Sequence, residues 1–178
     1  MRFGKEIAVE IHEYRKRVKA LADLRNGGAI FNGSADHAAV IVENLFNVAQ
    51  HHVRILAGDL DARVYGNSKV VQRATEFIGH NDHRLEILIE HNTLSAQHPL
   101  VLALKDASNV TVKIIPPSVA EGTPYHFMTA DEDCYRFEET KGSHKAIAAF
   151  GQKSAMALVN IHNSIMAHST PLNLATLH

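Results

Sequence analysis

The sequence predicts an α/β fold in which a mixed β-sheet is flanked by helices and preceded by an amphipathic helix at the N-terminus. Helix-like and strand-like segments alternate from residue 29 to about residue 115, an order that is typical of α/β domains. Two further strand-like segments, between residues 125 and 138, are separated by a short acidic turn, which indicates a hairpin. With 178 residues, the chain has the length of about one domain.

The first predicted element is a helix over residues 5–24. Its apolar side chains recur with a 4-3-4-3 spacing, which places them on one helix face; they are Ile7, Ile11, Tyr14, Val18 and Leu21. This apolar stripe must be covered, either by the domain's own sheet or by a second copy of the chain. Asn26, Gly27 and Gly28 then end the helix, because glycine adopts the left-handed conformation that closes helices.

The following elements are predicted from the same local signals. Ala29–Phe31 is a short strand, and Ser34 is placed as the N-cap of the next helix, whose apolar residues run from Ala38 to Ala49. Further strands are expected at residues 52–56, 85–90 and 110–115, with helices at residues 69–79 and 99–107.

The C-terminal part begins after a break at Pro116 and Pro117. Strands at residues 125–130 and 134–138 form the hairpin, and a long helix is expected from about Ser143 to Ala167. The residues after Pro171 are expected to trail along the surface. We therefore divide the chain into an N-terminal helix, residues 1–25, and one α/β domain, residues 26–178.

Composition excludes several classes of protein. Hydrophobic residues make up 46% and charged residues 21%, which is close to the globular average and excludes a disordered or collagen-like chain. Eighteen Lys and Arg against nineteen Asp and Glu give a net charge of −1, which does not favour nucleic-acid binding. The single cysteine, the absence of a secretory signal and the absence of a long apolar run predict a cytoplasmic protein without a membrane anchor.

Thirteen histidines raise the question of a metal site. Neither His80 with His83 nor His91 with His98 has the i, i+4 spacing of a helical zinc site. We therefore expect no metal and no cofactor. Asp59 and Asp61 could hold Mg²⁺, but aspartates in turns more often bond their own backbone. Acidic neighbours would raise the pKa of the Cys134 thiol, which argues against a cysteine nucleophile.

The most specific pattern is the segment from Pro124 to Asp131, followed by Tyr135–Glu138. Earlier segments fit the same picture: His37-Ala38 opening a helix, HHVRILAGDLDARVYG, and RLEILIEH. Together they resemble a half-unit of the phospholipase D-like superfamily, from about residue 29 to residue 168.

The resemblance implies a definite chemistry. Active members use His-x-Lys-x4-Asp, and two copies of this motif meet in one site, so a chain with one copy must form a dimer. One His attacks phosphorus and the other protonates the leaving group, while the lysines stabilise charge and the aspartates orient the imidazoles.

This chain matches the motif only in part. If Asp131 takes the Asp position, His126 falls on the Lys position and Pro124 on the His position. If His126 takes the His position, Met128 falls on the Lys position and Asp133 on the Asp position. Either register lacks a group that the chemistry needs.

We therefore expect a catalytically degenerate domain that acts as a binding, regulatory or dimerisation module. The alternatives are a small dimeric phosphodiesterase or nuclease, in which His126 works with Asp131 or Asp133, and a nucleotide or nucleic-acid binder without cleavage. Arg136 and Glu138 share a strand face and either bind an anion or form an ion pair.

Two further features bear on ligands and partners. Ser143, after Gly142, matches the Gly-Ser that follows the family motif, and it suits a turn or helix cap equally well. Basic residues gather on the first helix and acidic residues on the hairpin, so complementary patches could steer association. We expect a homodimer, with the first helix as a surface for a partner protein.

Overall fold

The computed structural model describes residues 2–177, with side chains described for residues 10–177. The helices are α1 (Arg2–Leu24), α2 (Ala35–Val48), α3 (Ser68–Ile78), α4 (Pro99–Leu104), α5 (Pro117–Gly122) and α6 (Ala155–His168). The strands are β1 (Ala29–Asn32), β2 (His52–Ala57), β3 (Arg84–Ile89), β4 (Val110–Ile114), β5 (His126–Ala130), β6 (Cys134–Glu138), β7 (Ala146–Phe150) and β8 (Thr170–Pro171).

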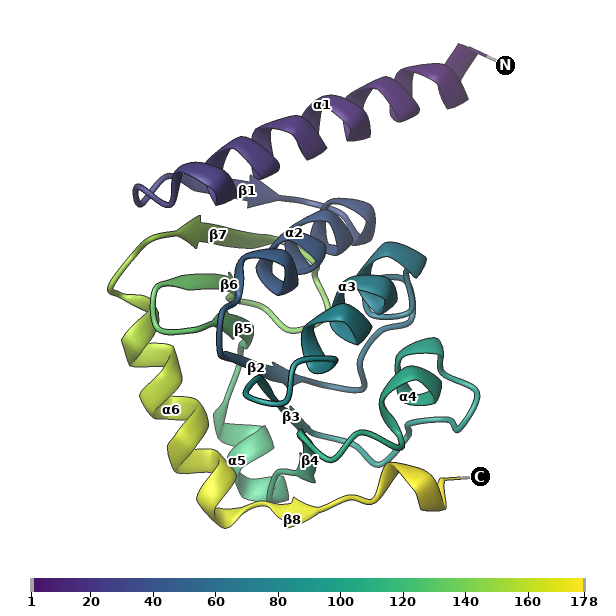
Figure 1. Cartoon of the computed structure of the whole chain (residues 1–178), viewed down its shortest axis with the longest axis vertical. Coiled ribbons are helices and arrows are strands. Elements are labelled where there is room, and N and C mark those ends of the chain that lie inside the picture. The colour runs from purple at the N-terminus through teal and green to yellow at the C-terminus, as the bar shows by residue number, and fades with distance from the viewer. Residues whose placement is uncertain (1, 178) are drawn as a thin grey trace.

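Within the described chain, the strands form one sheet in the order β1-β7-β6-β5-β2-β3-β4-β8 (Figure 1). β2, β3 and β4 are parallel and are linked by helical crossovers, whereas β5, β6, β7 and β1 are antiparallel to their neighbours. The predicted α/β fold with a mixed sheet flanked by helices is therefore confirmed, and so is the hairpin between β5 and β6.

Helices cover the two faces of the sheet unequally (Figure 1). α2, α3 and α4 pack on one face over the main hydrophobic core, and α6 packs on the other face against β2 and β5. Alternation along β2 explains the two cores: Ile55 belongs to the main core, while the next residue, Leu56, points to the smaller core under α6.

α1 packs mainly against α2 and less against β7. Tyr14 and Val18 are buried, and Ile11 is half-buried against the same core, so this part of the stripe is covered within the chain. Ile7 lies outside the residues whose side chains are described. Ser34 is the N-cap of α2, as predicted, because its hydroxyl accepts a hydrogen bond from the His37 N–H at 3.2 Å.

The prediction of one long helix from Ser143 to Ala167 is wrong in its first half. Residues 146–150 form β7, a strand with a neighbour on each side, and the helix begins only at Ala155. Alanine favours helices locally, but Ala148 and Ala149 are fully buried in the sheet, and this burial outweighs the local preference. Gly151, at φ +79°, turns the chain out of the strand.

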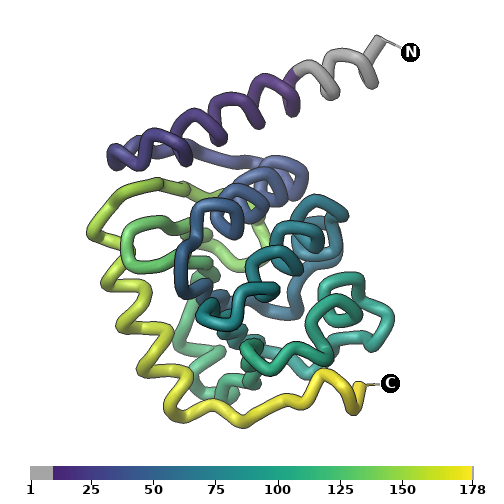
Figure 2. The backbone as a smooth tube through the Cα atoms, in the orientation of Figure 1, coloured from purple at the N-terminus to yellow at the C-terminus, as the bar shows by residue number. Residues whose placement is uncertain are grey.

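The C-terminal segment runs along the surface, as predicted, and is also tied to the sheet. β8 pairs with β4, and the Leu172 N–H donates to the Val112 carbonyl oxygen at 2.9 Å. Figure 2 shows this segment, in yellow, continuing from α6 across the β4 side of the molecule. Leu174 is buried there. None of the helices in the described part of the chain is both long and apolar enough to cross a membrane.

Candidate functional site

Charged and polar side chains gather where β2 and β3 end and β5 begins. β2 and β3 are parallel, so their carboxyl ends lie at one edge of the sheet, and the antiparallel β5 starts at that edge. We call this group the β2-end cluster. Its members are Asp61, Arg63, Glu90, His126, Arg136, Glu138, Lys141 and His144.

His126, the first residue of β5, lies at the centre of this cluster. Its Nε2 is 3.2 Å from Oε1 of Glu90, whose side chain is only 6% exposed. The ammonium of Lys141 contacts the same Glu90 oxygen and also donates to the Ala120 carbonyl oxygen at 2.7 Å. Burial lowers the pKa of His126, and the negative charge of Glu90 opposes this only in part. The imidazole is therefore neutral at neutral pH and has a carboxylate beside it.

Arg136 and Glu138 form a buried ion pair on one face of β6. Their charged atoms are 3.0 Å apart, and their side chains are 5% and 6% exposed. The second Glu138 oxygen accepts the His144 N–H at 3.1 Å, so this carboxylate also holds the loop before β7. Of the two roles that the sequence suggested, the geometry is that of an ion pair.

Arg63 and Asp61 form a further ion pair, at the more exposed side of the cluster. The Arg63 guanidinium bonds both carboxylate oxygens of Asp61, with its shortest contact at 2.6 Å. These bonds hold the pKa of Asp61 below its ordinary value. Nε2 of His144 lies 3.2 Å from the same carboxylate. Asp61 is therefore engaged by side chains from two separate loops.

The space inside the cluster is small. The pocket beside it has a volume of about 100 Å³, and five members of the cluster line it: Asp61, His126, Arg136, Glu138 and His144. Gly58, just after the end of β2, lies beside His126, and a Cβ at residue 58 would make ordinary van der Waals contact with the imidazole, at 3.4 Å. Tyr65 forms part of the wall, and burial raises its pKa to about 12.

The two candidate aspartates do not lie with His126. Asp131 follows the last residue of β5, five residues beyond His126, and a strand of that length spans roughly 16 Å. The Asp131 carboxylate accepts backbone N–H bonds from residues 50, 51 and 52 at 2.9 to 3.0 Å. Asp133, at the same end of the sheet, is paired with Arg25. The structure thus brings together His126, Arg136 and Glu138, and leaves Asp131 and Asp133 at the opposite end.

The remaining candidates have local roles. The Ser143 hydroxyl accepts the Lys145 N–H at 3.2 Å within its own loop. Met128, which takes the lysine position in one motif register, is fully buried in the main core. Cys134 is buried too, and burial raises the pKa of its thiol to about 11.

Sequence reasoning missed Glu90, Lys141 and His144. Glu90 had a usable signal, because it follows directly on the strand of residues 84–89, at the edge where parallel strands end. Lys141 and His144 lie in an irregular loop between β6 and β7, so no periodic pattern marks them.

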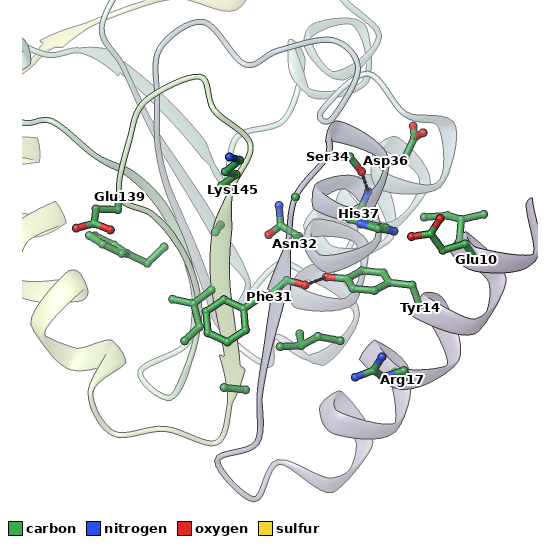
Figure 3. A pocket seen from close by; sticks show the side chains of 17 residues that line it. Glu10, Tyr14, Arg17, Phe31, Asn32, Ser34, Asp36, His37, Glu139 and Lys145 are labelled. Atoms are coloured by element: carbon green, nitrogen blue, oxygen red, sulfur yellow. Dashed lines mark hydrogen bonds between the residues drawn. The ribbon is translucent and has the colours of Figure 1, made fainter. Parts of the chain in front are cut away.

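A larger groove lies elsewhere, between α1 and β1 (Figure 3). Its volume is about 1080 Å³, and Glu10, Tyr14 and Arg17 of α1 lie on one side of it with Glu139 and Lys145 on the other. The Tyr14 hydroxyl donates to the Phe31 carbonyl oxygen at 3.0 Å. The Phe31 side chain is 73% exposed.

Several solved structures share this fold. Nuc, a phospholipase D family member from Salmonella typhimurium, matches with a TM-score of 0.59 and 11% identity, over 83% of this chain and 99% of that chain. NucT from Helicobacter pylori matches with a TM-score of 0.58 and 9% identity, over the same two shares. TrmBL2, an archaeal chromatin protein described with a novel mode of DNA binding, matches with a TM-score of 0.61 and 10% identity, over 96% of this chain and 65% of that chain.

These identities establish the fold alone, and the resemblance to the phospholipase D-like superfamily is confirmed at that level. No curated protein matches the chain in sequence. A family model matches residues 34–157, which is more than half of the chain. The chain therefore has a phospholipase D-like fold and belongs to the family described as Domain of unknown function (DUF7931).

Proposed function

We propose that this chain is a phospholipase D-like domain without phosphodiesterase activity, which forms a homodimer and serves as a binding module. One observation carries the lack of phosphodiesterase activity: the three cationic side chains of the β2-end cluster are already bonded to carboxylates. Arg136 pairs with Glu138, Lys141 with Glu90, and Arg63 with Asp61.

Phosphoryl transfer needs positive charge that is free to act on the reacting group. Its transition state spreads negative charge over the phosphoryl oxygens, and catalysis is mainly positioning and electrostatic stabilisation. Three carboxylates cancel the three cations here, and His126 is neutral because burial lowers its pKa. A phosphodiester in this place would face an electrostatically balanced site.

The size of the pocket supports the same conclusion. Sites for small molecules typically have volumes of roughly 300 to 1,000 Å³. The pocket at His126 has about 100 Å³, which is well below this range.

The rival function is a phosphodiesterase or nuclease centred on His126. The geometry gives this alternative Glu90 as the carboxylate beside the imidazole, in place of Asp131 or Asp133. It would further require Lys141 to leave Glu90 when a substrate binds.

An activity assay separates the two functions. Purified protein is incubated with single-stranded DNA, RNA and bis(p-nitrophenyl) phosphate, alongside H126A and the control H12A, at an exposed histidine of α1. We expect no turnover above buffer in any of the three proteins. Turnover that is lost in H126A and kept in H12A would overturn the proposal.

For the binding surface we propose the groove between α1 and β1, occupied by a second copy of the chain. In the described sheet β1 pairs only with β7, so its outer edge has no neighbouring strand. The exposed Phe31 lies between a basic residue, Arg17, and an acidic residue, Glu139, in the wall of this groove (Figure 3). A two-fold interface joins the same patch of both copies, so a patch with an apolar centre and both signs of charge complements itself.

Sedimentation velocity tests this assembly. We expect a dimer that F31E converts to a monomer, while the control L102E, at a 47% exposed leucine on α4, leaves it dimeric. The dimer should also weaken between about 0.05 and 0.5 M salt, because screening shortens to a few Å over that range. A monomeric wild-type protein, or a dimer unaffected by F31E, would refute the assembly.

A second candidate is a nucleic-acid binder without cleavage. Its support is the likeness to TrmBL2 over 96% of this chain, together with the basic residues of α1. Two of those residues, Lys16 and Lys19, are paired with acids on the same helix. Fluorescence anisotropy with labelled DNA decides this point. Binding without cleavage that R17E abolishes would favour the nucleic-acid binder over the dimerisation module.

A further inference from the structure

Three potential metal ligands meet at the turn between α3 and β3, far from the β2-end cluster. His80, Asp82 and His83 each offer one ligand atom, and these atoms all lie within 4.8 Å of one another. His80 and Asp82 are exposed, and His83 is half-buried. The rings of the two histidines are close, with centroids 4.6 Å apart. Sequence spacing did not reveal this group, because the i, i+3 pair lies in a turn rather than along a helix.

The hydrogen bond of His83 indicates its tautomer. Its Nδ1 is 2.9 Å from the Phe77 carbonyl oxygen, which can only accept, so this nitrogen carries the proton. The lone pair is therefore on Nε2. The imidazole also stacks on the Phe77 ring, with centroids 4.5 Å apart. A backbone carbonyl that orients the second nitrogen of a histidine is the usual support of a metal ligand.

The backbone of the turn is held in place by Asn109. Its side-chain amide donates to the carbonyl oxygens of Ile78, His80 and His83, at 2.9, 3.1 and 3.0 Å. The His83 N–H in turn donates to the His80 carbonyl oxygen at 3.1 Å. The turn that holds the two histidines is therefore already ordered. Ligand binding should cost little further backbone conformational entropy.

We propose that His80, Asp82 and His83 bind one divalent transition-metal ion, with Zn²⁺ as the best match. Two imidazoles and a carboxylate suit zinc better than magnesium, which prefers oxygen ligands. Ligand atoms around a tetrahedral zinc ion lie about 3.3 Å apart, given bond lengths near 2.0 to 2.1 Å. Exposed side chains reach that spacing by small rotations. Three protein ligands leave one coordination position for water or for a ligand of another molecule.

Zinc titration of protein without a histidine tag tests the site. We expect one Zn²⁺ per chain in competition with a chromophoric chelator, and Co²⁺ should give the visible absorption of a four-coordinate ion. H80A and H83A should each weaken zinc binding at least 10-fold, whereas H91A, at the opposite end of β3, should not. Saturating zinc should raise the melting temperature of the wild type by about 5 to 10 °C and leave that of H80A unchanged.

His80 is exposed and, among the described residues, its ring accepts no hydrogen bond, so H80A tests the site without disturbing the fold. Failure of the wild type to bind zinc or cobalt overturns the proposal, and so does equal zinc affinity in the wild type, H80A and H83A. The site does not depend on the proposed dimer or on the absence of catalysis, so these results leave the proposed function untouched.

Discussion

His162 on α6 makes the stability of this protein depend on pH. The side chain is fully buried, and neither ring nitrogen has a hydrogen-bond partner among the described residues. Burial lowers its pKa from 6.5 to about 4, although Glu86, whose carboxylate is 4.0 Å away, opposes this. The unfolded chain takes up a proton near pH 6.5 and the folded chain only near pH 4, so the free energy of unfolding must fall as the pH falls through this window.

The magnitude follows from the two pKa values. A fall from 6.5 to about 4 corresponds to about 3 kcal/mol when the full effect is reached. Between pH 7 and pH 5 the histidine alone should remove about 2 kcal/mol from the free energy of unfolding. H162L abolishes this titration and places an apolar side chain of similar size beside the ring of Phe127.

Urea unfolding followed by circular dichroism measures the effect, at one protein concentration and at pH 7 and pH 5. The wild type should lose about 2 kcal/mol more than H162L between these two pH values. The control H91L, at an exposed histidine, should follow the wild type. Parallel stability curves for the wild type and H162L would refute the reasoning, because both proteins share every other titrating group.

Three further predictions concern the ion pair, a backbone position and the cysteine. In urea unfolding, R136M should lower the free energy of unfolding by about 3 to 5 kcal/mol, because the Glu138 carboxylate would be buried without its cation. The double variant R136M/E138Q should recover much of that loss, because the buried carboxylate is replaced by a neutral amide. G151A should lower the melting temperature by several degrees, since φ is +79° and a Cβ would overlap the Arg25 carbonyl oxygen. The buried Cys134, whose pKa is raised to about 11, should react with iodoacetamide at pH 8 only after unfolding, which mass spectrometry detects.

Local patterns were enough to predict most elements. The apolar runs of β2 and β3, the acidic turn between β5 and β6, and the capping serine of α2 all depend on residues that are near one another in the chain. Hydrogen bonds and side-chain periodicity inside one segment are short-range, so the sequence carries them directly.

The candidate site was predictable only in part, because its chemistry depends on neighbours from distant segments. His126, Arg136 and Glu138 could be chosen from their residue types and their places on two strands. What His126 can do depends on Glu90 and Lys141, which lie 36 residues before it and 15 after it in the numbering. Asp131 matched a motif position but lies at the far end of β5, where its carboxylate binds backbone N–H groups.

The alanine-rich segment at residues 146–150 shows the same limit for the fold. Its composition favours a helix, yet it becomes a strand because β1 and β6 supply hydrogen-bonding partners on both sides. The α/β class and the apolar face of α1 follow from periodicity, which each segment carries by itself, and the hairpin follows from the short acidic turn between two neighbouring strands. The pairing of strands, the neutralised charges around His126 and the meeting of His80 with His83 arise only on folding, when long-range burial decides which segments come into contact.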